Sequence, residues 1–190
     1  MQSKFLGKPN RRNLMLGSAA LSFSSILPLS SKASLNTQHD IKSRALKFLS
    51  GLTDDQKTTA MVGFESPRRL NWNFMGPAAK PGLRLEQISE DQKLQVMDML
   101  SAVLSPEGMA KAEKVMILQD VLREMGDGPS DRNRERYSII FFGEPSDSKL
   151  WSWRFEGHHL TLSFTLIGNE VVSVTPSSFS SNPNSVDFGL

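Results

Sequence analysis

The chain has 190 residues, of which 38% are hydrophobic, and this is enough to bury the core of one domain. It contains no cysteine, which excludes disulfide bonds, thiolate metal sites, a cysteine nucleophile and a lipid anchor on cysteine. The pI near 9.0 does not indicate a nucleic-acid partner, because the excess of basic residues is confined to the first 33 positions.

Residues 1–33 are predicted to be an export signal. They hold five of the 22 Lys and Arg residues and no acidic residue. The rest of the chain therefore has 22 − 5 = 17 basic and 20 acidic residues, which is a net charge of −3. Arg11 and Arg12 precede an apolar run that serines interrupt and Pro28 ends, which is too short and too polar for a transmembrane helix. The small residues that end at Ala33 predict cleavage after that position.

This segment resembles a twin-arginine export signal, although Asn10 precedes the arginines and Leu14 and Met15 stand where that signal usually has Phe-Leu. An ordinary secretory signal is the alternative. Both routes predict a periplasmic or secreted protein with no stable membrane anchor once the signal is cleaved. Residues 34–39 then form a predicted linker before a single domain over residues 40–190.

Four helices are predicted in the first two-thirds of this domain. The first has Asp40 as its N-cap and an apolar stripe at helical spacing. The stripe consists of Ile41, Ala45, Phe48, Leu49 and Leu52. Capping boxes at Thr53–Gln56 and Ser89–Gln92 start the second and third helices, the second running to about Val62. The fourth begins with Pro106 at its first helical position and ends at Gly126.

Strands are predicted from position 137 onward, after a loop. The first three predicted strands are apolar or alternating segments at residues 137–143, 150–155 and 158–166. A predicted turn at residues 167–170 leads to a fourth strand at residues 171–175. Helices followed by strands indicate an α+β fold, with N-terminal helices packed on a C-terminal antiparallel β-sheet.

The segments "MLSAVLSPEGMAKAEKVMILQDVL" and, above all, "WRFEGHHL" are similar to a bacterial and fungal family, the domain-of-unknown-function 3500 family. The resemblance covers the N-terminal half of that family and implies a truncated or unusually short member, incomplete at its C-terminus. "SFSSNP" departs from the glycine-containing segment of the family. A half-length member would expose strand edges, as at Tyr137–Phe142, so self-association is also predicted. The resemblance implies a fold and an exported location but no reaction.

The alternation of apolar residues changes phase around two adjacent histidines. Apolar side chains occupy odd positions up to Phe155 and even positions from Leu160. One extra residue in a continuous strand would produce this change, and Gly157 can adopt the positive φ of a β-bulge. The sequence therefore predicts a bulge over Glu156–His158 that places the two histidines on opposite faces. A tight turn at Glu156 and Gly157 is the competing geometry.

Two kinds of chemistry would use these residues. His158 or His159 could bind a divalent metal ion together with Glu156 and further carboxylates. Alternatively, a histidine oriented by Glu156 could act as an acid or base in a periplasmic enzyme of the hydrolase type.

A third hypothesis is a small-molecule site in which Trp151, Trp153 and Arg154 form a carbohydrate or aromatic platform. The alternation of the strand also explains both tryptophans as core residues. The remaining alternative is a non-catalytic binding or structural protein, with one histidine packed inside and the other at the surface.

Overall fold

The computed structural model describes residues 41–75, 80–128 and 132–185. The predicted signal segment, the linker and the Asp40 cap lie outside these ranges. Within them, no helix is both long enough and apolar enough to cross a membrane.

The four predicted helices are present. Their bounds are α2 Ile41–Ser50, α3 Asp54–Ala60, α4 Glu90–Val103 and α5 Pro106–Glu124. Thr53 and Ser89 accept hydrogen bonds from the backbone N–H groups three residues on, as the capping boxes predict. Gly126 follows α5 with a φ of +71° and so allows the chain to leave the helix. Helix α3 is shorter than predicted, because the chain becomes extended at Met61.

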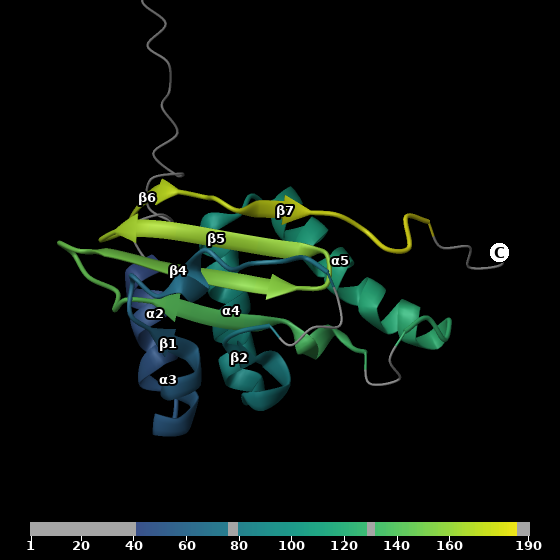
Figure 1. The fold of residues 1–190 in the computed structure, drawn as a ribbon, viewed down its shortest axis with the longest axis horizontal. Helices are drawn as coiled ribbons and strands as arrows, with labels where there is room; N and C mark the ends of the chain where they lie inside the picture. Colours follow the sequence, from purple (N-terminus) through teal and green to yellow (C-terminus); the bar gives the residue numbers. More distant parts are fainter. Residues whose placement is uncertain (1–40, 76–79, 129–131, 186–190) are drawn as a thin grey trace, which may run out of the picture. The chain divides into compact units, whose positions relative to one another are not determined.

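The strands form one mixed seven-stranded sheet (Figure 1). They are β1 Met61–Val62, β2 Leu83–Arg84, β3 Ser138–Phe142, β4 Leu150–Gly157, β5 Leu160–Ile167, β6 Glu170–Ser173 and β7 Ser177–Phe179. The order is β1-β3-β4-β5-β6, while β2 also pairs with β3 and β7 with β5. The α+β class is confirmed, but the sheet is not wholly antiparallel, because β1 runs parallel to β3.

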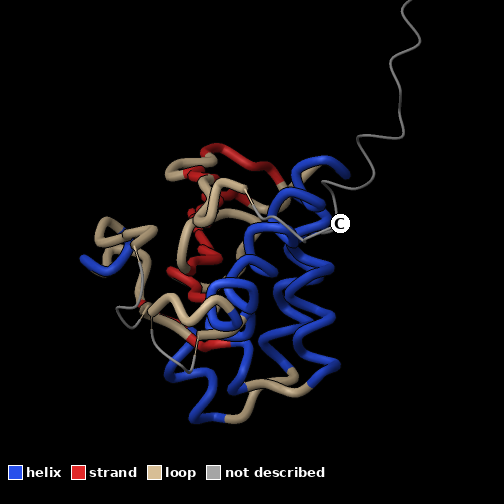
Figure 2. Tube along the Cα trace, turned by 90° about the vertical axis from the view of Figure 1, so that its right-hand side faces the viewer, coloured by secondary structure: helices blue, strands red, loops and turns tan. Residues whose placement is uncertain are grey.

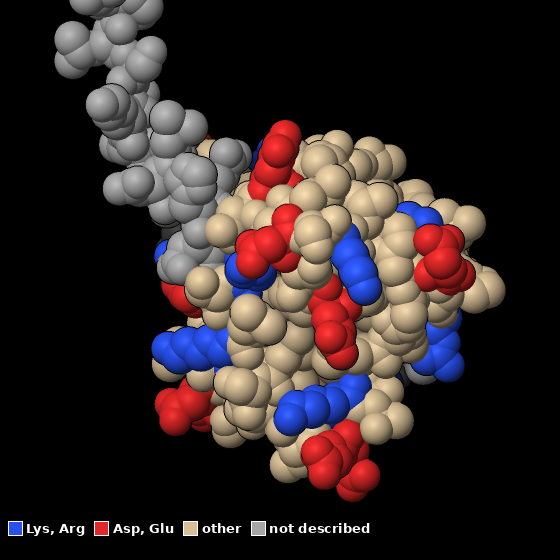
Figure 3. All heavy atoms as spheres, turned by 90° about the vertical axis from the view of Figure 1, so that its left-hand side faces the viewer, with Lys and Arg blue, Asp and Glu red and all other residues tan. Residues whose placement is uncertain are grey.

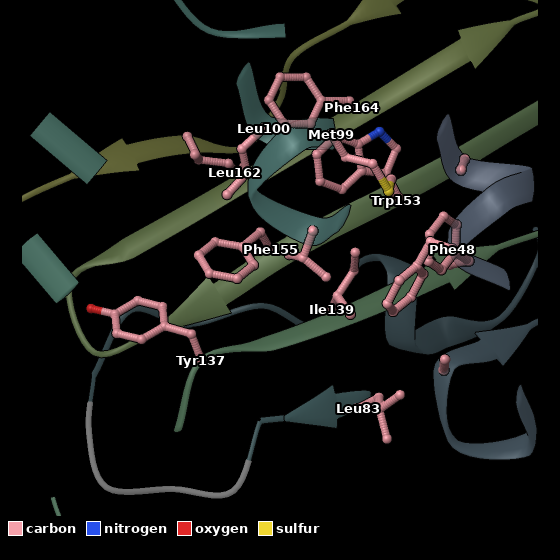
Figure 4. Close-up of a cluster of buried hydrophobic side chains, with 14 of the residues drawn as sticks. Phe48, Leu83, Met99, Leu100, Tyr137, Ile139, Trp153, Phe155, Leu162 and Phe164 are labelled. Carbon is pink, nitrogen blue, oxygen red and sulfur yellow. The ribbon is translucent and has the colours of Figure 1, made fainter. Parts of the chain in front are cut away.

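The helices gather on one side of the sheet and the main core lies between them and the strands (Figure 2). Trp153 on β4 and Phe164 on β5 stack with ring centroids 4.8 Å apart (Figure 4). Phe48 of α2 stacks on Phe141 of β3. Both aromatic pairs are buried. Aromatic pairs of this kind bury the largest apolar areas in a core, and here they tie the sheet to α2.

The strand predicted as an exposed edge is an interior strand. Every residue of β3 is buried, with β4 on one side and the short β1 and β2 on the other. The prediction that Tyr137–Phe142 leaves an uncovered edge is therefore wrong. The sequence could not show this, because β1 and β2 are only two residues long and lack a periodic pattern.

Charged side chains of both signs share the face shown in Figure 3. Lys42 pairs with Asp147, and Arg44 pairs with Asp98 at 2.5 Å, so α2 is joined by ion pairs to a loop and to α4. Surface pairs of this kind contribute about 0–1 kcal/mol each, and they do not create an extended field of one sign.

Candidate functional site

The two histidines form the turn of a β-hairpin. Strands β4 and β5 pair in continuous antiparallel register up to Gly157 and Leu160, leaving His158 and His159 as the two-residue loop. A two-residue loop pairs odd positions on β4 with even positions on β5, as in Phe155 with Leu162. The predicted bulge at Glu156–His158 is therefore wrong. The competing prediction of a turn has the right kind of geometry but lies two residues too early, at Glu156 and Gly157 instead of His158 and His159.

The two imidazoles lie side by side, not on opposite faces of the sheet. Their ring centroids are 4.1 Å apart and the planes are tilted by 52°. His159 has a φ of +104°, which is rare for a residue with a side chain and favours glycine. Such a conformation costs about 1–3 kcal/mol and is concentrated at functional sites. The turn thus has a histidine at a position where glycine would adopt the same backbone conformation at a lower free-energy cost.

Gly157 is required for a different reason from the one predicted. Its φ is not positive, but a Cβ there would lie 2.2 Å from Cδ1 of the Tyr137 ring. The Tyr137 hydroxyl donates a hydrogen bond of 2.5 Å to the His158 carbonyl. Burial raises the pKa of Tyr137, so the hydroxyl remains protonated and able to donate. Glycine therefore allows Tyr137 to pack beneath the turn and hold its backbone.

His158 is fixed by a side chain of α5. Its Nδ1 lies 2.8 Å from Gln119 Oε1, while Gln119 Nε2 donates a 3.4 Å hydrogen bond to the His158 carbonyl. Arg132 Nη1 is 3.3 Å from the same Nδ1. Because a guanidinium can only donate, Nδ1 cannot serve both neighbours, and the shorter contact assigns the proton to Nδ1. The Nε2 lone pair of His158 then remains to accept from a ligand.

The surroundings of His158 favour its neutral form. Burial lowers its pKa to about 4, and the nearby charges of His159, Arg132 and Lys80 act in the same direction. Asp127 opposes the shift without reversing it. The pKa of His159 is also lowered, by burial and by Arg132. At neutral pH the site therefore contains two uncharged imidazoles beside cationic side chains.

This shift predicts how stability depends on pH. His158 has a lower pKa in the folded chain than the ordinary 6.5, so the unfolded chain binds more protons between these values. The stability contributed by the neutral ring is complete above about pH 6.5 and is lost as the pH falls toward 4. We expect His158→Gln to flatten the decline between pH 6.5 and pH 4 in urea unfolding. Equal slopes in the two proteins would contradict this expectation.

His159 connects the turn to two other segments. Its Nδ1 lies 2.8 Å from the Ser180 hydroxyl, just after β7, and the Ser180 N–H donates to the His159 carbonyl at 2.9 Å. Its own N–H donates to the Phe74 carbonyl at 2.9 Å, and the Phe74 ring lies 6.3 Å from the imidazole. The turn is therefore fixed on three sides, by α5, by the chain after β7 and by the segment around Phe74.

Arg154 and Glu156 lie on the other face of the sheet from the tryptophans. Arg154 Nε is 2.5 Å from Glu156 Oε2, and both side chains are almost fully buried. Lys80 Nζ approaches Glu156 Oε1 at 3.8 Å. Burial lowers the pKa of Lys80, while the charge of Glu156 opposes that shift. These groups form a buried ion cluster without contacting either imidazole, so Glu156 does not orient a histidine here.

The ion cluster holds a segment that crosses the outer face of the sheet, which we call the covering segment (residues 68–75). The Arg154 guanidinium donates to the carbonyls of Arg68, Arg69 and Asn71 at 3.1–3.3 Å. The Asn73 N–H donates to Glu156 Oε1 at 3.0 Å. Arg154 and Glu156 thus satisfy backbone groups of the covering segment and have a structural role.

The predicted aromatic platform is not formed. Trp151 and Trp153 have no exposed surface and belong to the core on the helix side, whereas Arg154 points to the opposite face. Strand alternation requires this separation, because successive residues of β4 face opposite sides. The core interpretation of both tryptophans is confirmed.

Within the described ranges, no three His, Cys, Asp or Glu residues are grouped closely enough to hold a metal ion. The predicted grouping of His158 or His159 with Glu156 and further carboxylates is therefore not found among these residues. Arg132 and Lys80 place positive charge beside the imidazoles, which disfavours a cation.

Sequence reasoning missed the residues that surround the turn. They are Phe74, Lys80, Gln119, Arg132, Tyr137 and Ser180, and each lies at least 21 positions from the histidine it contacts or influences. Arg132 does stand in the conspicuous run "SDRNRERY", whose alternating charges are typical of a solvated loop. Only the tertiary fold brings that run to the hairpin.

The molecule is thus an α+β protein with a paired-histidine turn at one end of its central hairpin. The chain belongs to the family described as "Protein of unknown function (DUF3500)", whose model matches residues 35–189. The family resemblance of "WRFEGHHL" is confirmed by this match. Neither a curated protein nor a solved structure matches the chain.

Proposed function

We propose that the His158–His159 turn and Arg132 bind a small anionic ligand, such as a phosphate or carboxylate compound. The observation that carries this proposal is the pair of imidazoles 4.1 Å apart, held by a positive φ at His159 beside the Arg132 guanidinium. Arg132 supplies charge and hydrogen-bond donors that suit carboxylate and phosphate oxygens. With its proton on Nδ1, neutral His158 offers only an acceptor at Nε2, to which a protonated ligand oxygen can donate. Neutral His159 donates from Nε2 to a ligand oxygen when its Nδ1 accepts from the Ser180 hydroxyl.

Inorganic phosphate provides a direct test. We expect it to bind the purified chain in calorimetry and Arg132→Ala to weaken its affinity about 10-fold or more, because a hydrogen bond to a charged group contributes about 1.5–3 kcal/mol. Arg134→Ala is the matched control, because Arg134 pairs with Asp120 away from the turn. Equal effects of the two variants would overturn the proposal. Stabilisation by Zn²⁺ that His158→Ala removes would instead favour the metal hypothesis.

His159→Gly separates a binding role from a structural one. Glycine relieves the positive φ, so stability should be retained or increased, while the affinity for phosphate should fall. If His159 has only a structural role through its contacts with Ser180 and Phe74, His159→Gly should lower the stability and leave the affinity for phosphate unchanged. That result would favour the non-catalytic structural alternative.

A second candidate function is hydrolysis, and the contact between Ser180 and His159 favours it. A serine hydroxyl 2.8 Å from an imidazole nitrogen is within the range of an activated nucleophile and its base. Arg132 would then stabilise negative charge that develops on the substrate. Hydrolysis of an aryl ester or phosphate ester that Ser180→Ala abolishes, with the ligand still bound, would establish this function in place of simple binding.

We also propose that the chain is exported, on the basis of the paired arginines, the apolar run and the small residues before Ser34. Expressed in a bacterium with its first residues intact, the chain should appear in the periplasm with Ser34 at its N-terminus. Arg11→Lys with Arg12→Lys keeps the charge but removes both guanidinium groups. Export that stops in this variant indicates the twin-arginine route, and continued export indicates the ordinary route. A wild-type chain that stays in the cytoplasm would contradict export.

A further inference from the structure

The covering segment presents apolar side chains to solvent beside the paired-histidine turn. The exposed fractions are 77% for Leu70, 38% for Trp72, 39% for Phe74 and 66% for Met75. The Asn71 carbonyl and the Asn73 N–H point to the buried ion cluster on the sheet. Trp72 and Phe74 stand two positions apart on this segment, and both side chains are partly exposed to solvent.

The backbone that carries these two aromatic rings is held relative to the turn by hydrogen bonds. The Asn71 carbonyl accepts from Arg154, the Asn73 N–H donates to Glu156, and the Phe74 carbonyl accepts from the His159 N–H. The Phe74 ring lies 6.3 Å from the His159 ring. A ligand bound by the imidazoles would therefore meet aromatic side chains whose backbone is already ordered, so little backbone freedom is lost on binding.

We infer that the anionic ligand carries a flat ring with an apolar face next to its anionic group, and that Phe74 and Trp72 receive this ring. The inference rests on the proposed anion site and adds the class of ligand. An aryl ring and a sugar ring both offer such a face to an aromatic side chain. The anionic group would lie at Arg132 and the histidines, and the ring would lie over the covering segment.

Three phosphates test this inference on the purified chain. We expect phenyl phosphate or glucose 6-phosphate to bind about 2- to 12-fold more tightly than inorganic phosphate, the range that corresponds to one aromatic pair. Preference for phenyl phosphate identifies an aryl ligand, and preference for glucose 6-phosphate identifies a saccharide. Phe74→Ala and Trp72→Ala should remove the preference while leaving the affinity for inorganic phosphate unchanged. Leu70→Ala, on the same segment but farther from the turn, is the control.

The outcomes distinguish the two proposals. Equal affinities for all three phosphates, or a preference that survives both aromatic substitutions, would overturn the inference about the ring. Failure of every phosphate to bind, or binding that Arg132→Ala leaves unchanged, would overturn the anion site itself. Because all three side chains are exposed, we expect the three variants to keep the melting temperature of the wild type. Measuring the melting temperatures then excludes unfolding as the cause of any change in affinity.

Discussion

Arg154→Ala is expected to destabilise the chain by about 3–5 kcal/mol in urea unfolding, because it leaves the Glu156 carboxylate buried without its closest partner. Three carbonyls of the covering segment lose their donor at the same time. Lys80, 3.8 Å from Glu156, compensates in part and places the loss at the lower end of that range. The covering segment should also loosen, so trypsin should cleave after Arg68 faster than in the wild type.

The controls for Arg154→Ala separate the buried pair from general loss of charge. Arg134→Ala removes a half-exposed arginine that also pairs with an acid, and should cost no more than about 1 kcal/mol. Arg154→Met combined with Glu156→Met should cost less than Arg154→Met alone, because the second change removes the uncompensated carboxylate. A loss below 1 kcal/mol in Arg154→Ala, with unchanged cleavage, would show that the ion cluster does not hold the covering segment.

The sequence predicts the helices well because their signals are local. Thr53, Ser89 and Pro106 each mark a helix start within four residues, and the structure has a helix at each. The turn at Gly168 is equally local, and Gly168 has the positive φ that the hairpin requires. The sequence does not predict strands β1, β2 and β7, because a segment of two or three residues is too short to show a periodic pattern. These segments are strands only because they pair with β3 or β5.

The sequence located the candidate site but not its geometry. A change of phase in the apolar pattern follows equally from an inserted residue and from a two-residue turn. Glycine usually occupies the positive-φ position of such a turn, but here that position is His159, and the glycine stands one place before the loop. Because the glycine precedes the loop, its position in the sequence suggested the positive-φ residue of a β-bulge. The partners Gln119 and Arg132 could not be predicted, because only tertiary packing brings α5 and its following loop to the hairpin.

Gly157→Ala is expected to destabilise the chain by about 2–4 kcal/mol. The added Cβ would lie 2.2–2.6 Å from three atoms of the Tyr137 ring, and that ring cannot easily move because it is buried and stacked on Phe155. Overpacking costs about 1–3 kcal/mol, and displacement of the ring also breaks its hydrogen bond to the His158 carbonyl, worth about 1 kcal/mol. Gly63→Ala is the control, since no atom lies within 4 Å of its added Cβ.

The cause of the Gly157 effect can be isolated in a double-mutant cycle with Tyr137→Ala. If the Tyr137 ring is the obstacle, Gly157→Ala should cost less than about 0.5 kcal/mol in the Tyr137→Ala background, because the space is then empty. If glycine were needed for backbone freedom, as a bulge would require, the cost would persist without the ring. Affinity for phosphate should fall in Gly157→Ala but not in Gly63→Ala, because Tyr137 supports the backbone that carries both imidazoles.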